Sequence, residues 1–105
     1  MKLAFDLETD GLLDDLSVIH CLAAIDMDTG QQYRFEPHQI KEGLALLQQA
    51  DELWGHNIIS YDFQAIRKIY PRWTFKGIAY DTLILSRLLF TDILDRDFRS
   101  RPANM

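Results

Sequence analysis

The order of apolar patterns along the chain predicts an α/β fold with a mixed sheet. Three strand patterns come first, and then helix and strand patterns alternate to the end. Strands joined through a helix run parallel, because the crossover returns the chain in the same direction. The first three strands are joined by short loops and can pair as an antiparallel meander. We therefore expect a three-strand antiparallel meander extended by parallel strands with crossover helices.

Each element has its own local signal. Strand-like runs cover residues 2–8, 18–27 and 31–35, with an Asp-Thr-Gly turn before the last. Pro37 suits the first turn of a helix, which apolar spacing then extends through Ala50. The later elements are expected at 52–56 (strand), 58–70 (helix), 78–80 (strand) and 82–91 (helix). The single Cys21 is expected to be a buried strand residue without a disulfide.

Composition narrows the class of protein. The 105 residues with 48% hydrophobic content suffice for one small domain or a piece of one. No run of about eighteen apolar residues is present, and an acid follows the start too early for a signal peptide. We therefore expect a soluble, cytoplasmic protein with no membrane partner.

The charge of the chain is acidic, with a formal net charge of −5. This argues against binding nucleic acid through bulk electrostatics, but a nuclease with an acidic metal site remains compatible with it. Two local basic groups stand out, namely Arg67, Lys68, Arg72 and Lys76, and then Arg96, Arg99 and Arg101. The first group is most simply interpreted as solvated helix surface.

Two acidic residues near the end of the first strand are the strongest functional signal. Asp6 and Glu8 are two residues apart, so both carboxylates point to one face of the strand. Neighbouring carboxylates are ionised at pH 7 and repel one another unless a cation lies between them. Because hard oxygen ligands favour Mg²⁺ or Mn²⁺, we expect a divalent metal site here.

A third carboxylate, Asp62, falls within the apolar arc of the helix expected at 58–70. Burying a lone carboxylate is costly unless it meets a partner, and no basic residue shares that arc. Asp62 is therefore a candidate for the same metal site. The alternative is that it lies at the rim of the arc and is solvated.

Two short motifs resemble those of the DEDD superfamily of 3′–5′ exonucleases. They are Asp6-Leu7-Glu8-Thr9 and Asn57-x-x-x-Tyr61-Asp62. The closer resemblance is to the proofreading domain at the N-terminus of family A DNA polymerases of T-seven-like phages, whose segment after the second motif resembles residues 80–88. It implies a ribonuclease H-like α/β fold that is incomplete, with residues 1–105 as the N-terminal part of the exonuclease domain, an irregular tail at 91–105 and no second domain.

The resemblance also implies a function for the parent protein. It would be a phage DNA polymerase whose exonuclease removes nucleotides from single-stranded DNA 3′ ends, and the rest of the polymerase chain would be a partner. The complete domain would use two Mg²⁺ or Mn²⁺ ions. The position matching Asp6 bridges both ions, that matching Glu8 binds the ion that activates water, and that matching Asp62 serves the second ion.

Three further residues match positions that contact substrate in the resembled family. Thr9 and Asn57 match residues at the terminal nucleotide, and Leu12 matches an apolar residue that wedges against the last base. The structural alternative is equally weighted, with Thr9 and Asn57 as turn and cap residues and Leu12 in the core.

The chain departs from the family at the third motif. That motif supplies a fourth Asp preceded at four residues by Tyr, or at five by His, and neither spacing occurs here. Losing a ligand and the group that orients water costs several orders of magnitude in rate. Asp81 is a possible substitute, although its position before a helix favours an N-cap. His56 is a weaker candidate, since a lone His at a strand end is more often structural.

The sequence thus predicts part of a proofreading exonuclease that is inactive by itself. Two alternatives remain open. One is a module that binds metal, nucleic acid or protein without catalysis, and the other is a compact nuclease that uses Asp81 as its last carboxylate.

Overall fold

A five-stranded mixed sheet forms the centre of the protein in a computed structural model that describes residues 1–85. The spatial order of the strands is β3-β2-β1-β4-β5. Their bounds are β1 Lys2–Thr9, β2 Ile19–Asp26, β3 Gln32–Phe35, β4 Glu52–Gly55 and β5 Ile78–Asp81. The first three strands pair antiparallel, whereas β4 pairs parallel to both β1 and β5. The expected α/β fold with a ribonuclease H-like mixed sheet is confirmed.

Two helical segments connect the parallel strands. The first comprises the 3₁₀ turn η1 (Pro37–Gln39) and α1 (Ile40–Gln49). The second begins with a π-helical turn, η2 (Ile58–Asp62), and continues as α2 (Phe63–Ile69). The sequence predicted a single regular α-helix over 58–70. The structure differs at the start of this segment, where η2 has the wider hydrogen-bonding pattern of a π-helix. Residues 82–85 begin a further helix, while the rest of the segment 82–91 and the tail 91–105 lie outside the described residues.

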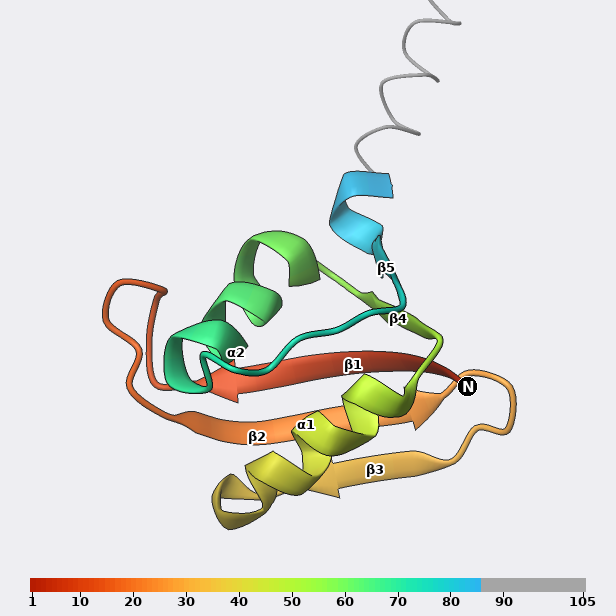
Figure 1. Cartoon of the computed structure of the whole chain (residues 1–105), viewed down its shortest axis with the longest axis horizontal. Helices are drawn as coiled ribbons and strands as arrows, with labels where there is room; N and C mark the ends of the chain where they lie inside the picture. Colours follow the sequence, from red (N-terminus) through yellow and green to blue (C-terminus); the bar gives the residue numbers. More distant parts are fainter. Residues whose placement is uncertain (86–105) are drawn as a thin grey trace, which may run out of the picture.

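The two faces of the sheet differ in their cover. Figure 1 shows α1 over β2 and β3, and α2 near the carboxyl end of β1. Along β1 the residues Leu3, Phe5 and Leu7 are buried, whereas Asp6 and Glu8 on the other face are exposed. The Phe5 ring stacks on Phe63 of α2 with centroids 6.0 Å apart, which places the core between helices and sheet. Strand alternation therefore separates the core from the acidic pair.

Two sequence expectations about burial have different outcomes. Cys21 is buried on β2, as expected. Trp54, which alternates with apolar residues along its strand, is expected in the core but is only half-buried. Its ring stacks on Tyr80 at 4.2 Å between centroids, and its indole N–H donates to Glu52.

Strands β1 and β4 pair over only part of the length of β1. Their parallel pairing covers only Lys2 to Ala4 of β1, and β4 ends at Gly55. A side chain at Gly55 would clash with Ile58 and with the carbonyl oxygen of Phe5, so a glycine is needed where β4 turns into η2. The second half of β1 therefore has η2 rather than a strand along this edge.

No helix in residues 1–85 has the length and apolar character needed to cross a membrane.

Candidate active site

Asp62 lies at the junction of η2 and α2 and is the central residue of the site. It is only 4% exposed, and its Oδ2 atom has no hydrogen-bond partner among the described residues. Burial and, to a lesser degree, the charge of Asp6 raise the pKa of Asp62 to about 7, against the opposing effect of the backbone N–H of Leu7. The helix face therefore carries an inward acid, as the apolar arc predicted, and the alternative of a solvated rim position is wrong.

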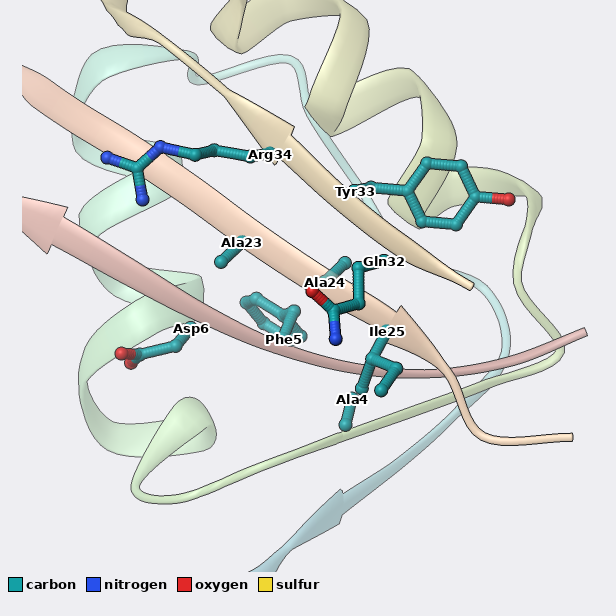
Figure 2. Close-up of a pocket in the computed structure, with 9 residues that line it drawn as sticks. All are labelled: Ala4, Phe5, Asp6, Ala23, Ala24, Ile25, Gln32, Tyr33 and Arg34. Carbon is teal, nitrogen blue, oxygen red and sulfur yellow. The ribbon is translucent and has the colours of Figure 1, made fainter. Parts of the chain in front are cut away.

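Asp6 contributes a second carboxylate near Asp62. It projects from β1 on the face away from the helices, and its charge raises the pKa of Asp62. Figure 2 shows Asp6 at one end of a depression of about 500 Å³ across β1, β2 and β3. Three alanines contribute to its lining, and one of them, Ala23, stands opposite the exposed Asp6 in the strand register. Asp6 is therefore accessible from solvent.

Glu8 shares a strand face with Asp6, as the two-residue spacing predicted. Within residues 1–85, no three side chains of His, Cys, Asp or Glu are grouped closely enough to hold a metal ion. The convergence of Asp6, Glu8 and Asp62 on shared ions thus stays a prediction. A buried carboxylate oxygen without a partner, beside a second acid, nevertheless fits a divalent cation, which would satisfy that oxygen and remove the repulsion.

The two sequence motifs are joined by a hydrogen-bond network. The Tyr61 hydroxyl donates to the carbonyl oxygen of Gly11 at 2.8 Å and lies within hydrogen-bond distance of the Thr9 hydroxyl. The Thr9 hydroxyl also lies 2.9 Å from the same carbonyl, and because it has one proton it donates either to Tyr61 or to Gly11 at a given moment. Residues more than fifty positions apart are thereby tied together at the carboxyl end of β1. This network fixes the loop that follows Asp6 and Glu8.

Leu12 lies in that loop and is 74% exposed, so the alternative of a core residue is wrong. The loop is anchored on both sides of it. Asp15 and Leu16 donate backbone N–H groups to the Leu12 carbonyl oxygen, and Lys68 of α2 donates to the carbonyl oxygen of Leu13. An exposed apolar side chain on an anchored loop is available for contact with a ligand.

Asn57 adopts the left-handed conformation, with φ 61° and ψ 27°. Asparagine tolerates this backbone conformation better than most residues, which is a structural reason for an asparagine at position 57. The residue occupies the N-cap position of η2 without a side-chain capping bond. Its backbone N–H donates to Asp81 at 2.9 Å.

Asp81 is the other buried acid at this end of the sheet, with 3% exposure. Its carboxylate accepts four backbone N–H groups, from Asn57, Ile59, Leu83 and Ile84. Burial favours a higher pKa, but these donors outweigh it and lower the pKa of Asp81. This is the geometry of an N-cap that also holds the turn before η2, in line with the structural alternative considered for Asp81.

His56 is exposed, and its Nδ1 lies 3.2 Å from the Thr82 hydroxyl. His56 therefore forms a hydrogen bond with the first residue of the helix after β5. Two residues were not singled out from the sequence as functional positions. Tyr61 was only part of the second motif, and Gly55 carried no signal except its place at a strand end.

Comparison with solved structures shows which proteins share this fold. A structure of exonuclease I without ligand matches with a TM-score of 0.62 and 16% identity, over 99% of this chain and 32% of that one. Escherichia coli exonuclease I in complex with a dA16 oligonucleotide matches with a TM-score of 0.61 and 17% identity, over 99% and 31%. The complex with a dT13 oligonucleotide has the same values. The chain therefore has an exonuclease-like fold and spans about a third of those proteins.

No family model and no curated protein matches this sequence.

Proposed function

We propose that this chain is the N-terminal part of a 3′–5′ exonuclease domain that hydrolyses phosphodiester bonds at single-stranded DNA 3′ ends. On this proposal the parent protein is a phage DNA polymerase, and the exonuclease serves in proofreading. The remainder of the polymerase chain is its partner, and residues 1–105 contain no second domain.

The observation that carries the proposal is the unpaired oxygen of Asp62 beside Asp6. A buried acid with an unsatisfied atom, next to a like charge, is unfavourable in a protein without a ligand. Metal binding relieves both costs. The similarity to exonuclease I supports the same conclusion, because the matching proteins include complexes with DNA oligonucleotides.

The proposed cofactor is Mg²⁺ or Mn²⁺, with two ions in the complete domain. Asp6, Glu8 and Asp62 would hold them, and the ions would supply an activated water and charge stabilisation at phosphorus. The protein's own part is to position these acids. Asp6 and Glu8 are fixed by strand pairing with β2, and Asp62 is fixed by the packing of α2 on Phe5. Rigid placement matters because small displacements of such groups reduce catalysis.

The DNA end is proposed to meet the loop after β1. Leu12 supplies an exposed apolar surface for the last base. Thr9 and Asn57 would contact the terminal nucleotide, and both lie at turns held by hydrogen bonds. The Tyr61 hydroxyl positions this loop without contacting the reacting atoms.

The isolated chain is proposed to have little or no activity, since its sequence lacks the third motif. The alternative of a compact nuclease needs Asp81 as a metal ligand. Four backbone N–H groups already occupy that carboxylate, which argues against this role. A module that binds metal or another molecule without cleavage remains the second alternative, and the absence of the third motif favours it for the isolated chain.

The test begins with the coding DNA beyond Met105. We expect an open frame that contains Tyr-x-x-x-Asp, and a protein extended through that segment should cut single-stranded DNA from its 3′ end when Mg²⁺ is present. The chain of 105 residues is the matched control and should cut negligibly. Rapid cleavage by the control, lost in Asp81→Asn, would instead establish the compact nuclease.

A further inference from the structure

A second cleft lies among α1, the end of α2 and the turn that follows it. It has a volume of about 500 Å³. The residues that line it are Lys41, Leu44, Ala45, Gln48, Ile69, Tyr70, Pro71, Arg72 and Trp73. None of them belongs to the proposed catalytic site. The cleft therefore needs an explanation of its own.

The floor of the cleft is apolar and is held by hydrogen bonds. Trp73 is 6% exposed, and its indole N–H donates to the carbonyl oxygen of Leu44 at 3.0 Å. Its ring also packs 5.8 Å from that of Phe63. On one side, Gln48 of α1 donates to the carbonyl oxygen of Thr74 at 2.9 Å, which ties the helix to the turn. The floor is thus formed before any ligand arrives, which lowers the entropic cost of binding.

The rim of the cleft carries two free cations. Lys41 and Arg72 are exposed, and no acidic residue lines the cleft. In the part of the chain that the structure describes, the ion pairs are Met1 with Asp51 and Arg34 with Glu36, so neither rim cation is paired. Arg67 and Lys68 of the same basic group are engaged elsewhere, over the Phe63 ring and at the Leu13 carbonyl oxygen.

Positive charge at an apolar cleft stands out in a chain of net charge −5. We propose that this cleft binds an acidic peptide segment of a partner protein, which places a large apolar side chain against Ile69, Tyr70 and Pro71 and carboxylates at Lys41 and Arg72. Such an arrangement combines a buried anchor with charged rim contacts. A nucleic-acid strand fits less well, because base stacking requires open aromatic faces, whereas the apolar lining is mostly aliphatic and Trp73 is almost fully buried.

The test uses the full chain and a labelled short peptide rich in aspartate with one central leucine and one phenylalanine. Fluorescence anisotropy should show binding that weakens when the two apolar residues become serine, and also when the aspartates become asparagine. Addition of increasing amounts of the peptide should shift the NMR signal of the Trp73 indole N–H. A single-stranded oligonucleotide of equal charge serves as the competing ligand and should bind more weakly.

Variants localise the contact. Reversing both rim charges with Lys41→Glu and Arg72→Glu should weaken peptide binding by about tenfold or more at low salt. Ala45→Trp, at an exposed position of α1, should block the cleft without a change of charge. Lys76→Glu is the matched control, because Lys76 is exposed but does not line the cleft, and it should change affinity by less than about twofold. Absence of peptide binding, equal loss in the control, or tighter oligonucleotide binding that shifts Trp73 would overturn the proposal.

Discussion

Asp62 and Asp81 are both buried acids, but their carboxylates differ in hydrogen bonding and in the direction of their pKa shifts. Both are less than 5% exposed; Asp81 is the last residue of β5, and Asp62 lies at the junction of η2 and α2. Asp81 accepts four backbone N–H groups, whereas one oxygen of Asp62 has no partner within residues 1–85. The pKa of Asp81 is lowered, and burial together with Asp6 raises that of Asp62 to about 7.

The difference separates a structural acid from a functional candidate. A fully bonded carboxylate stabilises the backbone groups it caps, and a ligand would have to displace those bonds. A carboxylate with a free oxygen beside a like charge is unfavourable by itself but ready to bind a cation. Burial alone would not distinguish the two, so the bonding partners decide the assignment.

Metal binding should give the largest contrast between the two acids. We expect weak Mn²⁺ binding by the chain, reduced by at least about tenfold in Asp6→Ala and in Asp62→Asn, because each substitution removes a ligand. Asp81→Asn should retain binding. Free Mn²⁺ measured by electron paramagnetic resonance would report this, and equal loss in Asp81→Asn would erase the distinction.

Stability should change in opposite directions at the two positions. Asp81→Ala leaves four backbone donors without their acceptor and should lower the free energy of unfolding by roughly 2–4 kcal/mol. Asp62→Asn removes a buried charge and should raise it by roughly 1–2 kcal/mol at pH 8. Urea unfolding in the presence of chelator measures both. A destabilised Asp62→Asn would show that the acid has a structural partner after all.

The pH dependence should carry opposite signs as well. Folded Asp62 holds its proton up to about pH 7, whereas the unfolded chain releases it near the ordinary value of about 4. The folded state then binds the extra proton in this window, so the free energy of unfolding falls as pH rises through it. Asp81 has the lowered pKa, so its contribution is complete above the ordinary value and is lost as pH falls through the folded value.

Urea unfolding at pH 5 and pH 8 in chelator separates these effects. From pH 5 to pH 8 the free energy of unfolding of the unsubstituted chain should fall by roughly 1–3 kcal/mol more than that of Asp62→Asn. Asp81 is ionised at both pH values and does not contribute to this difference. Parallel pH profiles for the two proteins would mean that Asp62 ionises normally in the folded state.

The smallest expected effect concerns the loop that joins the two motifs. Tyr61→Phe removes the hydrogen bonds to Gly11 and Thr9 and should cost about 1 kcal/mol, with faster amide exchange in residues 10–18. Thr9→Val should cost a similar amount. Because the two hydroxyl groups bond each other, the double variant should cost less than the sum, and strict additivity would contradict the proposed network.

Much of the fold and part of the site followed from local sequence patterns. A period of two residues placed Asp6 and Glu8 on one face of β1, opposite Leu3 and Phe5. A helical period placed Asp62 among buried residues. The exposure of Leu12, the half-buried position of Trp54 and the π-helical turn did not follow from them, because each depends on neighbours distant in the chain.

The sequence by itself determined the order of the elements, the acidic face of β1 and the inward position of Asp62. Only the tertiary structure decided what each acid meets. The amide groups around Asp81 include two from more than twenty residues away, and the Thr9 hydroxyl finds Tyr61 across fifty-two positions. Periodicity is a local property of the backbone, which a short segment can reveal. The free energy of a buried charge depends on the groups that surround it, and those are brought together only by the complete fold.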